Sequence, residues 1–346
     1  EAVGAAARPA AASAVMRPQE LGMLAFAAAR TGDDFSGGGV GGVGGDIILG
    51  DRGRVLWFTP GSIPLSGYAD VALTAADLAA LEAVAVAVSG HGGFGDSTDG
   101  VDGRLIGLVI TVDPTIGARD IVTTGIGDDI VLGGAGGDEI TTNRGETAGS
   151  PDGTNIVLGD HGFVDYVLRD GDATDIDRIW STDPDEGGLD TITTGVGDDI
   201  VIGGDEGDII GVSDGFNLVI GDNGRITAAA NDNDPLTAAR ISWGLLPITL
   251  GRMETIQAGI GGGDTITSGT GNDIVLGGAG GDGISAGTGT NIVIGDHGYI
   301  DWTAADAGRD TLEGYTGRTF DLLGGDDTDA TDIDRIWSTD PDEGGL

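Results

Sequence analysis

A nine-residue period dominates this sequence, in which glycine-rich stretches alternate with short runs of β-branched residues. Within TTGIGDDIVLGGAGGDEITT (123–142), Asp129 and Asp138 take the sixth place of successive nonapeptides, and Val131 and Ile140 take the eighth. Three blocks of four such rungs keep this register, and all twelve eighth places hold Val or Ile. A chain with this period buries one apolar residue per short strand only if its coils stack on one another.

The sixth places hold carboxylates or carboxamides throughout. They are Asp120, Asp129, Asp138 and Asn155 in the first block, Asp190, Asp199, Asp208 and Asn217 in the second, and Asp264, Asp273, Asp282 and Asn291 in the third. An insertion near residues 143–150 displaces the fourth rung of the first block, and a fragment at residues 37–53 carries Asp46 in the same place. Stacked turns would bring these carboxylates together with backbone carbonyls. The pattern therefore predicts cages of hard oxygen atoms, which suit Ca²⁺ better than Mg²⁺.

The composition agrees with a folded, cation-binding chain. A formal net charge of −41 makes nucleic acid and anionic membranes poor partners. The 39% content of hydrophobic residues argues against disorder, in spite of the acidity. There is no cysteine, which excludes disulfides and thiolate metal sites. No apolar run reaches about 18 residues, so we expect no membrane insertion.

The nonapeptide resembles the RTX family of haemolysin-type calcium-binding repeats, whose consensus is GGxGxDxUx. Residues 41–46, 133–138 and 277–282 match its first six places fully. Thr, Ser or Ala replaces the first glycine elsewhere, and Glu206 replaces a fourth-place glycine, which puts the turn before Asp208 in doubt. The resemblance implies a calcium-stabilised parallel β-roll, or β-solenoid, that is exported and then folds in a calcium-rich extracellular medium.

The resemblance also implies metal ligands, carried over by position. The paired rungs are Asp120 with Asp138, Asp129 with Asn155, Asp190 with Asp208, Asp199 with Asn217, Asp264 with Asp282, and Asp273 with Asn291. The implied turn ligands are Gly125, Gly127, Gly134, Gly136, Gly195, Gly197, Gly204, Gly269, Gly271, Gly278 and Gly280, and Asp46 belongs to the fragment. We expect the asparagines to weaken their sites. A metal-free, glycine-rich solenoid is the alternative.

Each block ends in a Gly-Asp-x-Gly motif, as in NIVLGDHG at residues 155–162. The aspartates of the four motifs are Asp51, Asp160, Asp222 and Asp296. They are either Asx-turn residues that end the roll or additional calcium ligands, and the sequence leaves both open. His161 and His297 stand between Asp and Gly in two of these motifs. We expect both to be exposed turn residues without a catalytic or zinc-binding role.

The two strand types of each block differ in polarity. Even rungs are apolar at all three strand places, as in Ile130-Val131-Leu132, whereas odd rungs have mostly polar outer places, as in Thr191 and Thr193. A strand that is apolar on both faces is buried on both faces. We therefore expect one sheet to be covered, by the intervening segments, by a second roll or by another chain.

The expected fold is all-β, with roll blocks, intervening loops, a short hairpin and a minor helix. The blocks are residues 119–165, 189–227 and 263–302, separated by an acidic linker at 166–188 and an insertion at 228–262, with an Ala/Gly-rich region at 1–118 and an acidic, duplicated segment at 303–346. Residues 74–83 begin with a Thr cap and predict the helix. Residues 83–88 and 104–112 predict the two strands of the hairpin.

No catalytic signature is present: the sequence lacks HExxH, GxSxG, a P-loop and any Cys nucleophile. Residues 172–189 recur identically at 329–346, so we expect further repeats or a strand from a neighbouring chain. We predict a non-enzymatic extracellular structural protein, such as a fibre, sheath, surface-layer or adhesin segment, that binds calcium and self-associates. The alternatives are the export and folding part of a larger secreted enzyme, or an ice- or surface-binding solenoid suggested by the Thr-x-Thr strands at 191–193 and 265–267.

Overall fold

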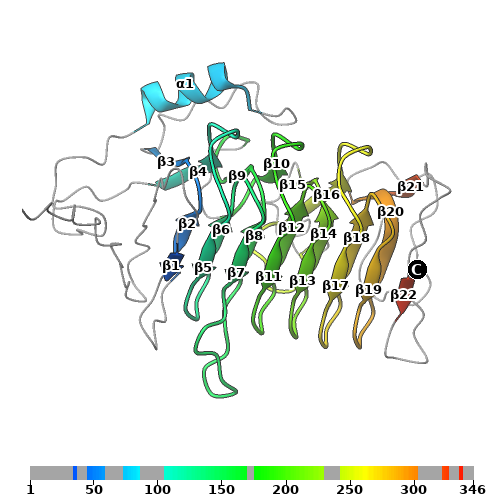
Figure 1. The fold of residues 1–346 in the computed structure, drawn as a ribbon. Coiled ribbons are helices and arrows are strands. Elements are labelled where there is room, and N and C mark those ends of the chain that lie inside the picture. Colours follow the sequence, from blue (N-terminus) through cyan, green and yellow to red (C-terminus); the bar gives the residue numbers. More distant parts are fainter. Residues whose placement is uncertain are drawn as a thin grey trace, which may run out of the picture.

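The computed structural model describes residues 34–36, 45–58, 73–85, 105–169, 175–229, 242–302, 322–326 and 335–337. It is mostly β with one helix, which confirms the predicted class (Figure 1). Within these ranges, no helix is both long and apolar enough to cross a membrane.

Successive nonapeptide strands alternate between two parallel layers, so that one coil contributes one strand to each. The first layer, here called the polar sheet, contains β1 (Asp34–Ser36), β5 (Ile121–Thr123), β7 (Glu139–Thr141), β11 (Thr191–Thr193), β13 (Ile209–Gly211), β17 (Thr265–Thr267), β19 (Gly283–Ser285) and β22 (Arg335–Trp337). The second, here called the apolar sheet, contains β2 (Ile47–Leu49), β6 (Ile130–Leu132), β8 (Ile156–Leu158), β12 (Ile200–Gly204), β14 (Leu218–Asp222), β18 (Ile274–Gly278) and the first half of β20 (Ile292–Asp301). Figure 1 shows the two layers side by side along the molecule.

The eighth-place residues form the core between these layers. Val131, Ile140 and Ile192 are among them, and each is at most 1% exposed. All twelve eighth-place residues of the three blocks, with Ile48 from the fragment, belong to one buried cluster. The period of nine therefore does what the sequence predicted, since it supplies one buried β-branched side chain per strand.

The three blocks form one continuous stack. In the polar sheet β7 pairs with β11 and β13 with β17, and in the apolar sheet β8 pairs with β12 and β14 with β18, all in parallel register. The fragment joins the same stack, because β2 pairs with β6. Segments of different length between the blocks thus return the chain to the next rung without a break in pairing.

These intervening segments build an antiparallel layer, here called the cover. It consists of β3 (Gly53–Phe58), β4 (Leu105–Thr111), β9 (Gly162–Asp165), β10 (Arg178–Ser181), β15 (Gly224–Ala228), β16 (Leu250–Thr255) and the second half of β20, which also pairs with β21 (Leu322–Asp326). The cover and the apolar sheet form one hydrogen-bonded sheet, which β20 joins by belonging to both parts. The segments at 166–188 and 228–262, expected as a linker and an insertion, supply β10 and β16.

The cover buries the outer face of the apolar sheet. Ile130, Leu158 and Ile200 from the apolar sheet belong to one buried cluster with Val164 and Ile226 from the cover. Of the three coverings that the sequence allowed, the intervening segments of the same chain are the one found. The outer face of the polar sheet stays open, since Thr193, Thr265 and Thr267 are exposed there.

The one helix, α1 (Ala75–Val84), begins where the sequence predicted. Thr74 and Asp77 form a capping box, in which each side chain accepts a hydrogen bond from the other residue's backbone N–H. Leu81 packs into a buried cluster with Leu56 and Leu108 from β3 and β4, so α1 lies over the cover (Figure 1).

The predicted hairpin is wrong in its pairing. β4 forms as expected, but its partners are β3 and β9 instead of residues 83–88. Residues 83–84 belong to α1, because the capped Ala- and Leu-rich helix continues through them, and residues 86–88 lie outside the described ranges.

Asp165 and Arg178 form a buried ion pair in the middle of the cover. They face each other across β9 and β10, and both side chains are fully buried. The Asp165 carboxylate lies 2.8 Å from both Nε and Nη2 of Arg178, and it also accepts the backbone N–H groups of Val167 and Leu168. Removal of the carboxylate would leave a buried guanidinium without its counter-charge.

We therefore predict that Asp165→Ala lowers the free energy of unfolding by about 3–5 kcal/mol. The control is Glu82→Ala, which breaks the exposed pair with Arg54 and should change stability by less than about 1 kcal/mol. Urea unfolding followed by circular dichroism measures both. Equal small changes in the two variants would show that the buried pair does not hold the cover.

Candidate metal centre

The sixth-place residues form two ladders, one along each edge of the stack. The turns that lead into the polar sheet make the glycine edge, with Asp120, Asp138, Asp190, Asp208, Asp264 and Asp282. The turns that lead into the apolar sheet make the hydroxyl edge, with Asp46, Asp129, Asn155, Asp199, Asn217, Asp273 and Asn291. The six pairs predicted from the sequence each join residues of one edge, but the sequence reasoning assigned calcium ligands to both edges alike.

In both ladders the backbone N–H of each rung donates to Oδ1 of the next rung. On the glycine edge the N···Oδ1 distances are 2.6–2.8 Å, as between Asp120 and Asp138. All six pairs implied by the resemblance are such neighbours. The ladders also cross the block boundaries, as from Asp138 to Asp190 and from Asn155 to Asp199.

The second carboxylate oxygens of the glycine edge are buried. Oδ2 of Asp138, Asp190, Asp208 and Asp264 makes no hydrogen bond, and these residues are at most 2% exposed. None of the ion pairs between described residues includes any of these four aspartates. The ladder therefore concentrates negative charge in a dry environment, which is unfavourable unless a cation or a proton compensates it.

The first-place glycines enclose these oxygens. A Cβ on Gly133 would come within 2.3 Å of Oδ2 of Asp138 and 2.0 Å of the Gly159 carbonyl oxygen. Gly203 meets Oδ2 of Asp208 in the same way, at 2.2 Å. A side chain is excluded at Gly133 and Gly203 because carboxylate and carbonyl oxygens fill the space.

Burial raises the pKa of the glycine-edge carboxyls far above the usual range. The pKa is about 9 for Asp138 and Asp208 and about 10 for Asp264, with burial as the largest cause. Repulsion from neighbouring carboxylates raises these values further, and burial also raises the pKa of Asp190. At neutral pH the metal-free edge therefore holds protons or carries a large electrostatic cost.

The aspartates of the Gly-Asp-x-Gly motifs join the glycine edge. Asp51 accepts the backbone N–H of Ala135 at 2.6 Å, and Asp160 accepts those of Gly188 and Asp205 at 3.1 and 2.5 Å. The Asp160 bonds tie two separate turns together, which supports the structural interpretation of this motif. The same carboxylates add negative charge to the edge, so the interpretation as additional ligands stays a prediction.

The hydroxyl edge compensates its charge differently. Its rungs alternate between Asp and Asn from Asp129 to Asn291, and the asparagine amides donate to the next aspartate. Nδ2 of Asn155 lies 3.1 Å from Oδ1 of Asp199, and Nδ2 of Asn217 lies 2.9 Å from Oδ1 of Asp273. Each asparagine thus separates two carboxylates with a neutral donor.

The turns that end at Asp129, Asp199 and Asp273 on this edge begin with a hydroxyl residue in place of glycine, whereas the turn that ends at Asp46 begins with glycine. Oδ2 of Asp129, Asp199 and Asp273 is also buried without a hydrogen-bond partner, and so are the hydroxyls of Thr124, Thr194 and Ser268. Burial raises the pKa of these carboxyls to about 7, 7 and 6, and the nearby hydroxyls of Thr124, Thr194 and Ser268, in that order, oppose the rise.

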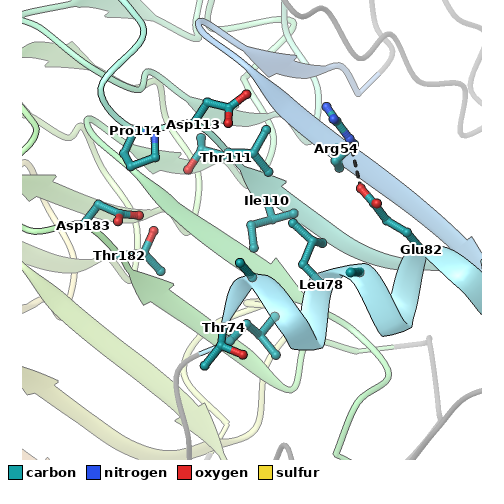
Figure 2. A pocket seen from close by; sticks show the side chains of 14 residues that line it. Arg54, Thr74, Leu78, Glu82, Ile110, Thr111, Asp113, Pro114, Thr182 and Asp183 are labelled. Atoms are coloured by element: carbon teal, nitrogen blue, oxygen red, sulfur yellow. Dashed lines mark hydrogen bonds and ion pairs between the residues drawn. The ribbon is translucent and has the colours of Figure 1, made fainter.

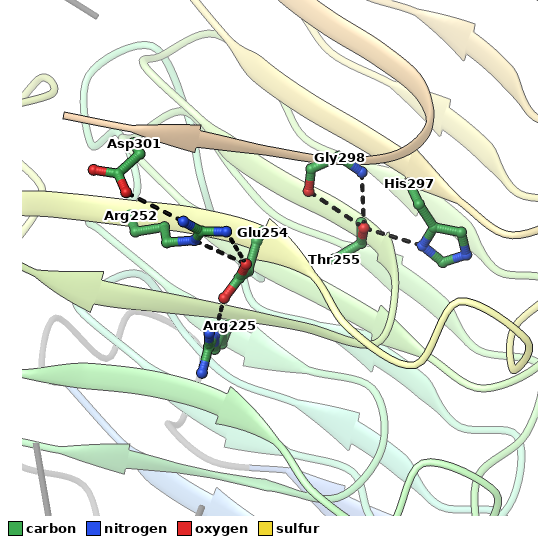
Figure 3. Close-up of polar contacts among 7 residues, drawn as sticks. All are labelled: Arg225, Arg252, Glu254, Thr255, His297, Gly298 and Asp301. Carbon is green, nitrogen blue, oxygen red and sulfur yellow. Dashed lines mark hydrogen bonds and ion pairs between the residues drawn. The ribbon is translucent and has the colours of Figure 1, made fainter. Parts of the chain in front are cut away.

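Both histidines of the Gly-Asp-x-Gly motifs are buried, so the prediction of exposed turn residues is wrong. His161 is 1% and His297 is 8% exposed. Their Nε2 atoms lie 3.1 Å from the carbonyl oxygens of Pro114 and Ala258, in the turn that crosses from the cover back to the polar sheet. Each crossing turn therefore covers the imidazole ring of its histidine. Figure 3 also shows His297 beside Thr255.

The crossing turns themselves are a repeated feature that the sequence reasoning did not find in full. Asp113, Asp183 and Gln257 occupy the same place in three of them, each with a left-handed backbone (φ 56°, 49° and 62°). A Pro follows the first two residues but not Gln257, and this difference hid the third turn inside the segment expected as an insertion. The shared signal is a left-handed residue seven places before the next ladder Asp (120 − 113, 190 − 183 and 264 − 257 are each 7), and its third copy lacks the Asp-Pro pair.

Arg225 and Arg252 of the cover form ion pairs with acidic residues of the same layer. Figure 3 shows Arg225 and Arg252 both paired with Glu254, and Arg252 also lies 3.2 Å from Asp301. The guanidinium of Arg252 stacks 4.2 Å from the ring centroid of Tyr299. These charges are neutralised where they lie, and they do not compensate the glycine edge.

A cleft of about 350 Å³ lies between α1 and the crossing turns (Figure 2). Leu78 and Ile110 line it together with charged groups: Arg54 contacts Glu82 at 3.1 Å, Asp113 contacts Arg52 at 2.8 Å, and Asp183 also lines the cleft. We assign the cleft no role.

The donor set of the glycine edge fits a hard cation in kind, since it consists of carboxylate and backbone carbonyl oxygens. Among the described residues, no three carboxylate or imidazole side chains converge as a ready metal site. The aspartates are instead distributed one per coil, so an ion would depend on turn carbonyls as well. The implied glycines lie in both sets of turns: Gly134, Gly136, Gly204, Gly278 and Gly280 on the glycine edge, and Gly125, Gly127, Gly195, Gly197, Gly269 and Gly271 on the hydroxyl edge.

Comparisons with protein-family models, curated proteins and solved structures give no match for this chain. The proposal of a function below therefore depends on the arrangement of the ladder residues in this structure.

The turn that ends at Asp208 forms in spite of Glu206 at the fourth place. Glu206 adopts φ 62°, a left-handed conformation, where the equivalent residues Gly136 and Gly280 have φ 95° and 94°. This conformation costs an L-residue about 1–2 kcal/mol. Glu206 also adds to the repulsion that raises the pKa of Asp160, although burial is the larger cause.

We predict that Glu206→Gly raises the free energy of unfolding by about 1 kcal/mol or more. Glu206→Gln removes the charge but keeps the left-handed side chain, and it should recover only the smaller electrostatic part. Thermal unfolding under identical conditions compares the two. A stabilisation by Gln as large as that by Gly would assign the whole effect to charge.

The raised pKa values also predict an unusual pH dependence for the metal-free protein. The folded state keeps protons on Asp138, Asp208 and Asp264 that the unfolded chain loses near pH 4, so stability is highest below about pH 4 and falls as the pH rises towards 9–10. In EDTA we expect β structure near pH 5 that is lost as the pH rises to 7 and above. Far-UV circular dichroism across this range measures it, and the loss is expected at higher pH for Asp138→Asn/Asp208→Asn. Stability that rises with pH would contradict the assignment.

Proposed function

We propose that this chain is a segment of an extracellular structural repeat protein that folds as a parallel β-roll when it binds calcium. The observation that carries the proposal is the glycine-edge ladder. Asp138, Asp190, Asp208 and Asp264 follow one another there with buried, unpartnered Oδ2 atoms. A metal-free solenoid gains nothing from this row of charges, whereas a calcium-dependent one requires it.

Calcium would compensate the charge and connect successive coils. The core between the two sheets is thin, since it buries one β-branched residue per strand. Such a core offsets little of the chain entropy, and the buried carboxylates add to the cost. When an ion binds the folded chain only, its binding free energy becomes folding free energy. The ligands would be the ladder carboxylates together with turn carbonyls, a donor set that favours Ca²⁺ over Mg²⁺.

A structural role agrees with the architecture. Each coil contacts only its neighbours, so the length of the stack can grow by repetition. Because the cover buries the apolar sheet, that face is not free for assembly, and pairing of strand edges between successive repeats is the route that we propose for self-association. A fibre, sheath, surface layer or adhesin segment would use such a stack. The export and folding part of a larger secreted enzyme would need the same calcium response.

The threonine array needed for ice binding is interrupted. Thr191 and Thr265 flank Ile209 in the register of the polar sheet, and Thr193 and Thr267 flank Gly211. A regular, flat row of hydroxyls is therefore absent at this place, and the ice-binding alternative gains no support.

The test is far-UV circular dichroism with light scattering at pH 7, in excess EDTA, in about 1 mM calcium and in about 1 mM magnesium. We expect a change from coil to β structure in calcium only, with scattering that grows after folding. A β signal that is indifferent to EDTA would overturn calcium-dependent folding. Folding in calcium with constant scattering would keep the calcium response and overturn the assembly.

A further inference from the structure

We propose that calcium binds at the glycine edge alone, and that the hydroxyl edge is built to fold without metal. The inference rests on the proposed calcium-dependent folding and makes it specific, since the sequence pattern and the resemblance placed ligands on both edges.

The first argument is the density of charge. On the glycine edge every rung from Asp120 to Asp282 is an aspartate, so each carboxylate has a like charge on the coils above and below. On the hydroxyl edge Asn155, Asn217 and Asn291 alternate with aspartates, and no two aspartates between Asp129 and Asn291 are adjacent. Only the first arrangement demands a cation to separate neighbouring charges.

The second argument is that asparagine amides donate hydrogen bonds to the neighbouring aspartates. Asn217 accepts the N–H of Asp199 at Oδ1, and its Nδ2 donates to Oδ1 of Asp273 at 2.9 Å. Asn155 repeats this between Asp129 and Asp199. An amide group with a partial positive charge thus contacts Oδ1 of each of these two carboxylates and offsets part of its negative charge.

The third argument is the first place of each turn. Thr124, Thr194 and Ser268 carry a hydroxyl side chain at this place on the hydroxyl edge. At Gly133, Gly203 and Gly277 of the glycine edge a side chain is excluded, because a Cβ would lie 2.2–2.3 Å from Oδ2 of the Asp in the same turn. Three turns of the hydroxyl edge therefore have a hydroxyl group where three turns of the glycine edge have close-packed carboxylate oxygens.

These differences give the edges separate tasks. The hydroxyl edge can align successive coils before calcium is present, since amide and hydroxyl groups support its ladder. The glycine edge then closes when calcium arrives, and it includes Asp160, whose buried carboxylate faces the same turns.

The test compares two matched triple variants that remove the same charge from each edge. The glycine-edge variant is Asp138→Asn/Asp208→Asn/Asp264→Asn, and the hydroxyl-edge variant is Asp129→Asn/Asp199→Asn/Asp273→Asn. Bound calcium per chain is measured by equilibrium dialysis, and the calcium midpoint of folding by circular dichroism, both on the full chain at pH 7.

We expect the hydroxyl-edge variant to bind as many ions as the wild type, with a midpoint within twofold. The glycine-edge variant should lose at least half of the bound ions, or shift its midpoint at least tenfold. A hydroxyl-edge variant that loses a third or more of its ions overturns the inference, even if the glycine-edge variant does not fold. A wild-type chain that binds no calcium overturns the proposed function itself, and the one-edge inference with it.

Discussion

One hydrogen bond, repeated once per coil on each edge, determines the register of the whole stack. It runs from the backbone N–H of a sixth-place residue to Oδ1 of the sixth-place residue on the next coil. Asp and Asn provide this acceptor equally well, so either residue preserves the fold. They differ in charge, so the choice between them can change the electrostatics of an edge without a change of register. The glycine edge uses only Asp, and the hydroxyl edge alternates the two from Asp129 to Asn291.

The cover buries the outer face of the apolar sheet, which the core between the two sheets leaves open. An apolar sheet with Ile, Val and Leu on both faces needs a second layer, and each Gly-Asp-x-Gly motif turns the chain from the apolar sheet into a covering strand. The same contacts recur at each turn: the hydroxyls of Thr111, Ser181 and Thr255 accept the backbone N–H groups of Gly162, Gly224 and Gly298. Core, cover and crossing turn therefore repeat as one unit, which is longer than the nonapeptide.

The sequence was sufficient for the elements that depend on local pattern. The eighth-place core, the alternation of polar and apolar strands and the capped helix at Thr74 all follow from residue period and side-chain chemistry, and the structure confirms them. Sequence reasoning was wrong about His161 and His297, because their burial comes from crossing turns that lie 47 and 39 residues earlier in the chain. It also misplaced the partner of β4, since β3 lies far from it in the sequence.

By itself the sequence determined that acidic residues stack at regular intervals around a β-branched core, because a strict period of nine admits no other register for them. The contacts that distinguish the all-aspartate edge from the edge with asparagines were decided by the folded chain. Alternate nonapeptides turn in opposite directions, so residues that share one consensus position meet different neighbours. Whether a carboxylate faces a hydroxyl, an amide or another carboxylate depends on the coil above it, and that neighbour is 18 to 83 residues away.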